Sequence, residues 1–307
     1  MVLSTSSSQG YLPDPRNDSV LVWMNGDLVP RDSAKVSIFD AGFVLGDGVW
    51  EGLRIVKGRI VALGDHLDRL WEGAGAIGLD LGMTRAELTE ALRTTLKANG
   101  MEDGAHIRLM VTRGRKSTVN QDPRFVIGPP TVVIVAEWKR SDPAIKARGL
   151  TLVTSAIRCS TPDVFDLRLN SHSRLNFIQA LIQAINLGAH EALMLDPMGF
   201  VASCNSTNFF IVRRREIWTS TGRFNFRGIT QRKVAALWRG AGNGVRETDF
   251  TLAETYAADE AFVTGTLGGI TPVVRIDGRQ IGSGGPGPVT EELAALYAAW
   301  LERPEAG

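Results

Sequence analysis

Cysteine, lysine and net charge are all scarce in this 307-residue sequence. Its two cysteines, Cys159 and Cys204, have neither metal-ligand nor redox-motif spacing, so we expect two buried thiols in a reducing compartment. Lys and Arg total 34 against 33 for Asp and Glu, which provides no basic surface for nucleic acid or an anionic membrane. No run of 18 apolar residues occurs, so no membrane-spanning helix is predicted.

The histidines and the N-terminal composition exclude further kinds of site. The four histidines are scattered without the spacing of metal ligands, so we predict no metal site. Residues 1–18 are rich in serine and lack the basic start and the apolar run of a signal peptide. We therefore expect a cytoplasmic protein whose first 18 residues form a flexible arm.

The length and the distribution of helix and strand breakers predict two domains. With 307 residues, of which 44% are apolar, the chain can bury a core in each domain. A charged stretch that contains Pro143 and Gly149 separates two strand-like segments, so we place a linker at 141–149. The domains are then a smaller N-terminal one at 19–140 and a larger C-terminal one at 150–307.

Hydrophobic periodicity and turn signals predict mixed α and β elements in both halves. Thr84 and Glu87 form a capping-box pair that predicts a helix at 84–99. Asn-Gly at 25–26 and Lys-Gly at 57–58 are typical of hairpin turns. The other predicted helices are 66–79, 175–187, 228–239 and 289–301. The predicted strands are 20–24, 53–56, 59–63, 107–112, 131–138, 150–157, 191–196, 209–213 and 261–265.

Several short strings occur in an order that points to one enzyme family. The first two are LGDGVWEGLR at 45–54 and HLDRL at 66–70. The later ones are VTRG at 111–114, GAHEAL at 188–193, STN at 206–208, GIT at 228–230, GT at 265–266, ITPV at 270–273 and GPVT at 287–290. Together they make the chain, from Val20 to Leu301, similar to the class IV aminotransferases. These are the fold-type IV pyridoxal phosphate enzymes, which include branched-chain aminotransferases, D-amino-acid aminotransferases and aminodeoxychorismate lyase.

The resemblance implies a fold, an assembly and a cofactor site. The fold is α+β, with two domains and an active site between them, and the usual assembly is a homodimer. The implied ligand is pyridoxal or pyridoxamine phosphate, with an amino acid or keto acid as the substrate. The implied cofactor-binding residues are Arg69, Asn208, Ile229, Thr230, Thr266 and Leu267. A guanidinium, hydroxyls and the amides of a helix N-terminus are suited to a phosphate dianion.

Two groups that define the family's chemistry are missing. An ungapped count back from the 188–192 string places the family's Schiff-base lysine at Asn170, and a shift of three residues would place it at Ser173. Neither register contains a lysine, because none occurs between Lys146 and Lys233. The glutamate that faces the pyridine nitrogen in the family falls on Ser203. An amide cannot form an imine, and loss of a positioned base alone lowers a rate by ~10² to 10⁴.

Five further residues are candidates for the substrate pocket. They are Trp50, Arg113, Arg115, His172 and Arg174. A tryptophan is more often in a core than in a pocket, and the two arginines of the 111–115 segment are as well explained by a solvated loop. The resemblance assigns no role to the polar groups near the lysine position.

Three functions remain open from the sequence. In the first, the chain is a class IV aminotransferase homologue that has lost ordinary transamination. It binds pyridoxal or pyridoxamine phosphate noncovalently, or another phosphate or carboxylate ligand instead, and lysine-independent chemistry is left open. In the second, it is an ordinary branched-chain or D-amino-acid transaminase, which needs another lysine such as Lys57 or Lys233. In the third, it is a non-catalytic partner of an active paralogue.

Overall fold

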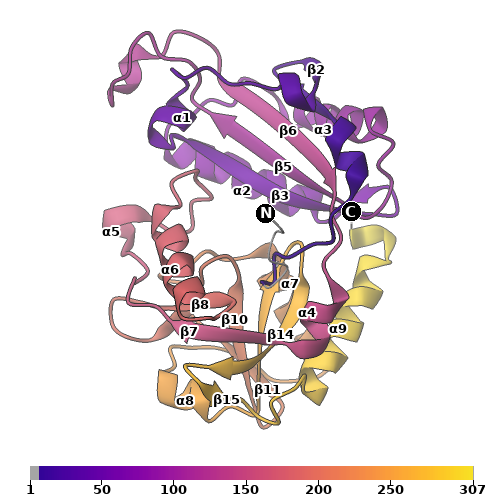
Figure 1. Cartoon of the computed structure of the whole chain (residues 1–307), viewed down its shortest axis with the longest axis vertical. Coiled ribbons are helices and arrows are strands. Elements are labelled where there is room, and N and C mark those ends of the chain that lie inside the picture. The colour runs from indigo at the N-terminus through magenta and orange to yellow at the C-terminus, as the bar shows by residue number, and fades with distance from the viewer. Residues whose placement is uncertain (1–6, 307) are drawn as a thin grey trace. The chain divides into compact units, whose positions relative to one another are not determined.

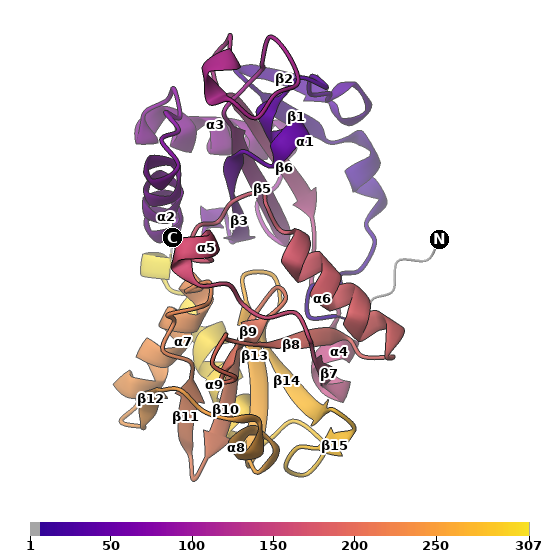
Figure 2. The same cartoon turned by 90° about the vertical axis from the view of Figure 1, so that its left-hand side faces the viewer.

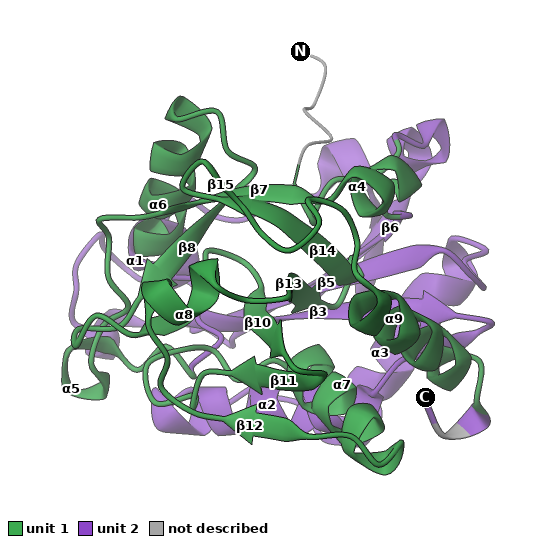
Figure 3. Cartoon of the chain, turned by 90° about the horizontal axis from the view of Figure 1, so that it is seen from below, with its two compact units in different colours: residues 1–12, 141–168, 175–303 green, residues 13–140, 169–174, 304–307 purple. Residues whose placement is uncertain are grey.

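The computed structural model describes residues 7–306, which divide into two compact units (Figures 1 and 3). Unit 1 consists of the described residues up to Leu12 together with Ser141–Arg168 and Leu175–Arg303. Unit 2 consists of Pro13–Arg140, Leu169–Arg174 and the C-terminal residues from Pro304. The chain passes from unit 2 to unit 1 at 140–141, and six residues, Leu169–Arg174, return to unit 2.

Unit 2 is built on a six-stranded antiparallel sheet in the order β2-β1-β6-β5-β3-β4 (Figure 1). Its strands are β1 (Leu21–Met24), β2 (Asp27–Pro30), β3 (Gly48–Val56), β4 (Arg59–Ile60), β5 (Ala105–Thr112) and β6 (Thr131–Trp138). Its helices are α1 (Ala41–Leu45), α2 (Leu63–Ala76) and α3 (Arg85–Ala98).

Period-two alternation gives the sheet of unit 2 one apolar and one polar face. In β5, Ile107, Leu109 and Val111 are buried in a core cluster with leucines of α2 and α3. The intervening His106 and Arg108 lie on the opposite face of the same strand. The helices therefore cover one face, and the other face carries ionisable side chains.

Residues 170–172 extend the sheet of unit 2 at the edge of β3. The Trp50 amide donates to the Asn170 carbonyl over 2.9 Å, and the His172 amide donates to the Gly48 carbonyl over 3.0 Å. Ser171 and Val49 form the isolated bridge between these two hydrogen bonds. This pairing places the predicted lysine position against β3.

Unit 1 is built on a nine-stranded mixed sheet in the order β12-β11-β10-β13-β14-β7-β8-β9, with β15 paired to β14. Its strands are β7 (Leu150–Thr154), β8 (Glu191–Leu195), β9 (Val201–Cys204), β10 (Asn208–Arg213), β11 (Glu216–Thr219), β12 (Val245–Glu247), β13 (Glu260–Gly265), β14 (Gly269–Ile276) and β15 (Arg279–Gln280). Its helices are α4 (Pro143–Arg148), α5 (Pro162–Phe165), α6 (Leu175–Asn186), α7 (Ile229–Gly240), α8 (Leu252–Tyr256) and α9 (Pro288–Leu301). Helix α6 packs beside β7 and β8 (Figure 2), whereas α7 and α9 pack on β13.

Most long elements that the sequence predicts are present with ends within three residues of the prediction, but β3 begins at Gly48, five residues before its predicted start. Helix α3 has the predicted capping box, in which the Thr84 hydroxyl accepts from the Glu87 amide and the Glu87 side chain accepts from the Thr84 amide. Both cysteines are buried free thiols, as predicted. No helix among residues 7–306 is long and apolar enough to cross a membrane, and no cluster of possible metal ligands occurs in that range.

Two segments differ from the sequence-based expectation. The segment 141–149, expected as a linker, contains helix α4, whose N-terminus is capped by the Asp142 carboxylate. Residues 1–6 of the expected flexible arm lie outside the described residues, but residues 8–18 have specific partners. Ser8 is buried against Glu191, and Asn17 exchanges two hydrogen bonds with the backbone of Trp138. Hydrogen bonds to residues distant in sequence therefore order parts of a segment whose composition resembles that of a loose terminus.

The two-residue hairpin turns of the chain share left-handed backbone angles but differ in composition. Asn25-Gly26, Lys57-Gly58 and Asp277-Gly278 each have positive φ at both positions and end in glycine, as type I′ turns favour. The turn between β10 and β11 instead contains Arg214 (φ 52°) and Arg215 (φ 64°). Because two arginines adopt the left-handed conformation, this turn has more backbone strain than the three turns that end in glycine.

We expect Arg214→Asn to raise the free energy of unfolding by about 0.5 to 1 kcal/mol, because asparagine tolerates the left-handed region better. Urea unfolding of the two proteins measures the difference. Arg223→Asn, at an exposed position without positive φ, is the matched control and should give no gain. Equal or lower stability of the Arg214 variant would contradict the strain argument.

Candidate functional site

The buried carboxylate of Glu51 is the centre of the polar network in unit 2. Glu51 lies on the helix-covered face of β3 and has no exposed surface. Helix α2 presents His66 and Arg69 to it, three residues apart on one helix face. The His66 Nδ1 lies 2.6 Å from Glu51 Oε2, and Arg69 donates from Nε to Oε1 and from Nη2 to Oε2, each over 2.7 Å. The Arg69 guanidinium is therefore held in a fixed, two-point orientation.

The charge state of Glu51 follows from these contacts. Burial alone would raise the pKa of the carboxyl, but the Arg69 charge and the hydrogen bonds from His66 and Arg69 outweigh it and hold the pKa at about 2. Glu51 is thus ionised at neutral pH although it is buried on the helix-covered face of the sheet. Sequence reasoning missed this residue, although it lies within the 45–54 string that carried the family resemblance.

The side chain of Asn170 is fully engaged within this network. It is 2% exposed, and its Nδ2 donates to the Trp50 carbonyl and, over 3.4 Å, to Glu51 Oε1. Its Oδ1 accepts a hydrogen bond from Arg174 Nη2. The amide therefore links the Glu51 carboxylate to the Arg174 guanidinium. In the alternative register, Ser173 is exposed, and its hydroxyl donates to the Gly46 carbonyl over 3.4 Å.

Arg174 and Arg108 flank the indole of Trp50. The Ser171 carbonyl accepts from both Trp50 Nε1 and Arg174 Nε, each over 3.0 Å. The guanidinium carbon of Arg108 lies 3.5 Å from the indole centroid, and that of Arg174 lies 5.7 Å from it. Burial and the charges of Arg69 and Arg108 lower the pKa of Arg174 to about 10, against the opposing effect of Glu51. The three guanidinium groups are thus close enough to repel one another.

Two histidines near these arginines are neutral at physiological pH. Burial and the charges of Lys139 and Arg108 lower the pKa of His106 to about 3. Burial and Arg108 lower the pKa of His172 to about 4. Within residues 7–306, the buried Nε2 of His172 has no hydrogen-bond partner. The positive charge of this region therefore comes from arginine and lysine.

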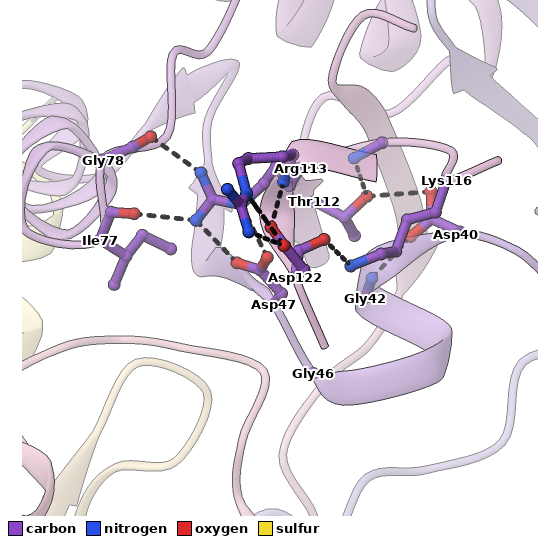
Figure 4. Close-up of polar contacts among 12 residues, drawn as sticks. Asp40, Gly42, Gly46, Asp47, Ile77, Gly78, Thr112, Arg113, Lys116 and Asp122 are labelled. Atoms are coloured by element: carbon purple, nitrogen blue, oxygen red, sulfur yellow. Dashed lines mark hydrogen bonds and ion pairs between the residues drawn. The ribbon is translucent and has the colours of Figure 1, made fainter. Parts of the chain in front are cut away.

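Arg113 and Arg115, predicted for the substrate pocket, lie in different surroundings, and Figure 4 shows the contacts of Arg113. Arg113 forms a two-point ion pair with Asp47, with distances of 2.7 and 2.9 Å, and donates to the carbonyls of Ile77 and Gly78 over 2.8 Å. It thereby binds the C-terminal end of α2. Arg115 is exposed. The pocket role of both arginines stays a prediction, and the contacts of Arg113 give it a structural role as well.

The same view shows a buried lysine that sequence reasoning did not single out (Figure 4). Lys116 is 2% exposed, and its Nζ donates to the Asp122 carbonyl over 3.0 Å. The lysines proposed as substitutes are placed differently. Lys57 is exposed in the β3–β4 turn, and Lys233 lies 4.6 Å from the ring centroid of Trp300.

In unit 1, three of the predicted cofactor-binding residues, Asn208, Ile229 and Thr230, lie at the start of α7. This helix begins at Ile229 without a side-chain cap, so its first amides have no acceptor from a side chain. A Cβ at Gly228 would lie 2.2 Å from Asn208 Oδ1, so only glycine fits beside that amide. The hydroxyl of Thr230 has no hydrogen bond to any described residue. The start of α7 thus has the properties of an anion site.

Other predicted residues of unit 1 lie in the strands near this helix. Ser203 is buried in β9, and its hydroxyl donates to the Thr207 carbonyl over 2.8 Å. Thr266 and the buried Leu267 form the turn between β13 and β14. In β13 itself, the Thr264 hydroxyl is buried and, among the described residues, has no hydrogen-bond partner.

Glu191 is a second buried carboxyl group. Thr207 links it to Ser203, because the Thr207 hydroxyl donates to Glu191 and the Thr207 carbonyl accepts from Ser203. Glu191 accepts hydrogen bonds from the Ser8 amide and hydroxyl and, over 2.8 Å, from the Thr207 hydroxyl. Burial raises the pKa of Glu191 beyond what these neutral donors offset. Its position in the 188–193 string was visible in the sequence, but its burial was not.

Comparison with known proteins supplies the family context. The family model described as amino-transferase class IV matches residues 48–276. "Branched-chain-amino-acid aminotransferase-like protein 2" of Arabidopsis thaliana is 41% identical over 96% of this chain. A "putative branched-chain-amino-acid aminotransferase" of Methanocaldococcus jannaschii is 37% identical over 90% of this chain and 94% of its own length. A T.th. branched-chain amino acid aminotransferase solved with pyridoxamine 5′-phosphate has 30% identity and a TM-score of 0.87, covering 94% of this chain and 96% of its own.

The extent of these matches differs between relatives. The chain spans about half the length of the matched Arabidopsis relatives, 53% of one and 54% of another. It spans nearly all of the archaeal relative and of the solved T.th. structure.

We expect Glu51→Gln to lower the free energy of unfolding at neutral pH by about 3 to 5 kcal/mol, because it leaves the Arg69 charge without its buried partner. The folded-state pKa of about 2 lies below the ordinary value of 4.5, so the stabilisation is complete above pH 4.5 and is lost as the pH falls toward 2. Over that range the difference between wild type and variant should shrink by about 3 kcal/mol.

Urea unfolding at several pH values between 7 and 2.5 measures this difference. Glu72→Gln, at an exposed position of α2, is the matched control and should change stability little at any pH. A stability difference between wild type and Glu51→Gln that does not change with pH would show that the carboxylate charge is not responsible.

Proposed function

Because this chain belongs to the class IV amino-transferase family, we propose that it is a member without ordinary transaminase activity that binds pyridoxal or pyridoxamine phosphate noncovalently. The observation that carries the proposal is the absence of lysine from the whole segment between Lys146 and Lys233. The hydrogen bonds of Asn170 support it, since they hold an amide rigidly at one of the two possible lysine positions.

The family matches confirm the resemblance derived from the motifs and the two-domain α+β fold that it implies. The solved relatives named with pyridoxamine phosphate or a phosphopyridoxyl ligand support the choice of cofactor. Whether this chain binds the cofactor, and without a covalent bond, is the proposal itself.

The phosphate end of the cofactor fits the residues of unit 1. The uncapped start of α7, the Thr230 hydroxyl and the orphaned Thr264 hydroxyl provide donors for an anion. We assign the phosphate to Ile229, Thr230 and Thr266; the role of Arg69 in phosphate binding stays a prediction of the resemblance. When bound, the cofactor supplies an aldehyde or amine and an electron-accepting pyridine ring.

The reactive end of the cofactor does not fit ordinary transamination. Neither Asn170 nor Ser173 can form an imine or move a proton as an amine does. Ser203 has no charge to keep a pyridine nitrogen protonated, and its hydroxyl already donates to the Thr207 carbonyl. The residues of this chain thus bind and orient a ligand but lack the nucleophile and the base of a transaminase.

The printed names of several relatives favour a second candidate, an ordinary branched-chain transaminase. That reading requires a lysine from another part of the sequence. The contacts of Lys57 and Lys233 described above give no support to either as a substitute. Some other phosphate or carboxylate ligand in place of the cofactor is a further alternative.

We also propose that a second copy of this chain covers an apolar patch on unit 2, as the resemblance implies for a homodimer. The apolar patch consists of the exposed side chains of Val36, Ile38, Phe39, Phe43, Leu45, Val119, Phe125 and Ile127. Its two loops are joined, since the Lys116 amide donates to the Phe39 carbonyl and the Ala41 amide to the Gly114 carbonyl, both over 2.9 Å. So many large apolar side chains on adjoining loops are typical of a protein interface.

The two buried free thiols are consistent with a cytoplasmic location, which we also propose. Fractionation of the source cells would test it. Recovery of the protein outside the cytoplasm would contradict it.

Titration of the purified protein with pyridoxal phosphate should change its absorbance, because the cofactor binds. Borohydride reduction followed by intact mass analysis should then show no adduct, because no lysine is placed to react. Asn170→Lys and Ser173→Lys are the matched variants. We expect one of them to gain a reducible adduct, which also identifies the lysine register.

The outcomes separate the candidate functions. An adduct in the wild type, or rapid exchange between amino and keto acids, would overturn the proposal and restore the transaminase reading. Loss of that adduct in Lys57→Ala or Lys233→Ala would identify the substitute lysine. Absence of any binding would overturn the cofactor and favour another anionic ligand.

Sedimentation velocity should show a dimer for the wild type, and Ile38→Glu with Phe43→Glu should convert it to a monomer. These side chains are 67% and 70% exposed, so the charges disturb the interface and not the core. Met198→Glu, at a position 74% exposed in the β8–β9 turn, is the control and should stay dimeric. A monomeric wild type would contradict the homodimer, and assembly only with an active paralogue would favour the non-catalytic partner.

A further inference from the structure

One continuous chain of contacts in unit 2 joins three arginines. Arg69 binds the Glu51 carboxylate, which Asn170 Nδ2 also contacts. Asn170 Oδ1 binds Arg174. The Ser171 carbonyl accepts hydrogen bonds from both Arg174 and the Trp50 indole. The guanidinium carbon of Arg108 lies 3.5 Å from the centroid of the indole ring. Asn170 therefore contacts Arg174 directly and is linked to Arg69 through Glu51 and to Arg108 through Trp50.

The charges in this chain of contacts are unequal. Glu51 provides one negative charge, whereas Arg69, Arg108 and Arg174 provide three positive ones. The lowered pKa of Arg174 has burial as its largest cause and the Arg69 and Arg108 charges next, which shows that the groups act on one another. Burial also lowers the pKa of Arg108. His106 and His172 are neutral at pH 7, so they neither add to this charge nor offset it.

We propose that this arginine cluster makes the site selective for the aldehyde form of the cofactor, pyridoxal phosphate, over the amine form, pyridoxamine phosphate. The inference rests on the proposed function and adds to it the form of the ligand. It assigns to Arg174 the role of a permanent cation beside the position where a class IV relative has its lysine.

The chemical basis is the difference between the two ligand ends. The aldehyde oxygen is a hydrogen-bond acceptor, which guanidinium groups stabilise. The amine form has an ammonium group at neutral pH, which requires acceptors and is repelled by nearby cations. The acceptors at this position are already used, since Asn170 Oδ1 binds Arg174 and the Ser171 carbonyl binds both Trp50 and Arg174.

The selectivity has a consequence for catalysis. A transaminase alternates between the aldehyde and amine forms of its cofactor, so its site must hold both. A site that disfavours the amine form cannot complete that alternation efficiently, whatever base it has. Two different properties of the site then exclude transamination. The missing lysine removes the reactive amine, and the charge of Arg174 disfavours the amine form of the cofactor.

Binding measurements with the two cofactor forms test the proposal. Isothermal titration at pH 7.5 should give a dissociation constant for pyridoxal phosphate about tenfold or more below that for pyridoxamine phosphate, the scale of one unscreened charge repulsion near a protein surface. Arg174→Gln should reduce this ratio by about tenfold, by weakening the aldehyde form and strengthening the amine form. Borohydride reduction and mass analysis run in parallel exclude a covalent contribution.

Two further variants separate charge from structure. Arg174→Lys retains the positive charge and should keep the preference, even if both forms bind more weakly. Arg168→Gln is the matched control, because Arg168, six residues before Arg174, is exposed and pairs with Asp166, and it should leave the ratio unchanged. Thermal unfolding of each variant verifies that it is folded.

The outcomes distinguish this inference from the proposed function. If the wild type binds both forms equally, or if Arg174→Gln weakens both forms by the same factor, the inference is wrong and the noncovalent cofactor site stands. If neither form binds, the proposed function fails and the inference fails with it.

Discussion

The buried carboxylate of Glu51 determines how the polar groups of unit 2 are arranged. A lone carboxylate on the covered face of a sheet is unfavourable, and it is tolerated here because His66 and Arg69 face it from α2. The same carboxylate contacts Asn170, which in turn orients Arg174. Removal of this one charge would leave Arg69 without its partner and Asn170 without one of its acceptors. The proposed selectivity of the site therefore depends on a residue that itself need not contact the ligand.

The cations in these contacts are arginines and not lysines, and the two side chains differ in reactivity. A lysine amine can lose its proton and attack a carbonyl, whereas a guanidinium stays charged and unreactive at any physiological pH. In this chain the residues around the predicted lysine position are an amide and a guanidinium, both bound to fixed partners. Such a site keeps the electrostatic part of a cofactor pocket and loses the covalent part. The class IV fold is therefore compatible with binding that does not lead to transamination.

Sequence reasoning succeeded where the signal was local and failed where it was not. Helix α3 was predicted from its capping box, and β6 from an uninterrupted β-branched run. Strand β14 was missed because Pro272 lies within it, and β9 because four residues give too short a pattern. Motif order identified the family, whereas the assignment of Asn170 and Ser203 to the lysine and glutamate positions stays a prediction. The contacts of Asn170 with Trp50 and Glu51 could not be predicted, because these residues are distant in sequence and meet only in the folded sheet.

The short segment 169–174 also bears on how the protein is made. The chain completes β1 to β6 of unit 2 by residue 138, but the segment that pairs with the edge of β3 is synthesised some thirty residues later, after β7 and α5. During synthesis, the nascent unit 2 therefore has an unpaired strand edge and a buried Glu51 without its Asn170 contact. An open edge is where nascent chains pair wrongly or recruit chaperones. Ribosome release or pausing before residue 174 would thus leave a domain that is nearly complete yet prone to aggregation.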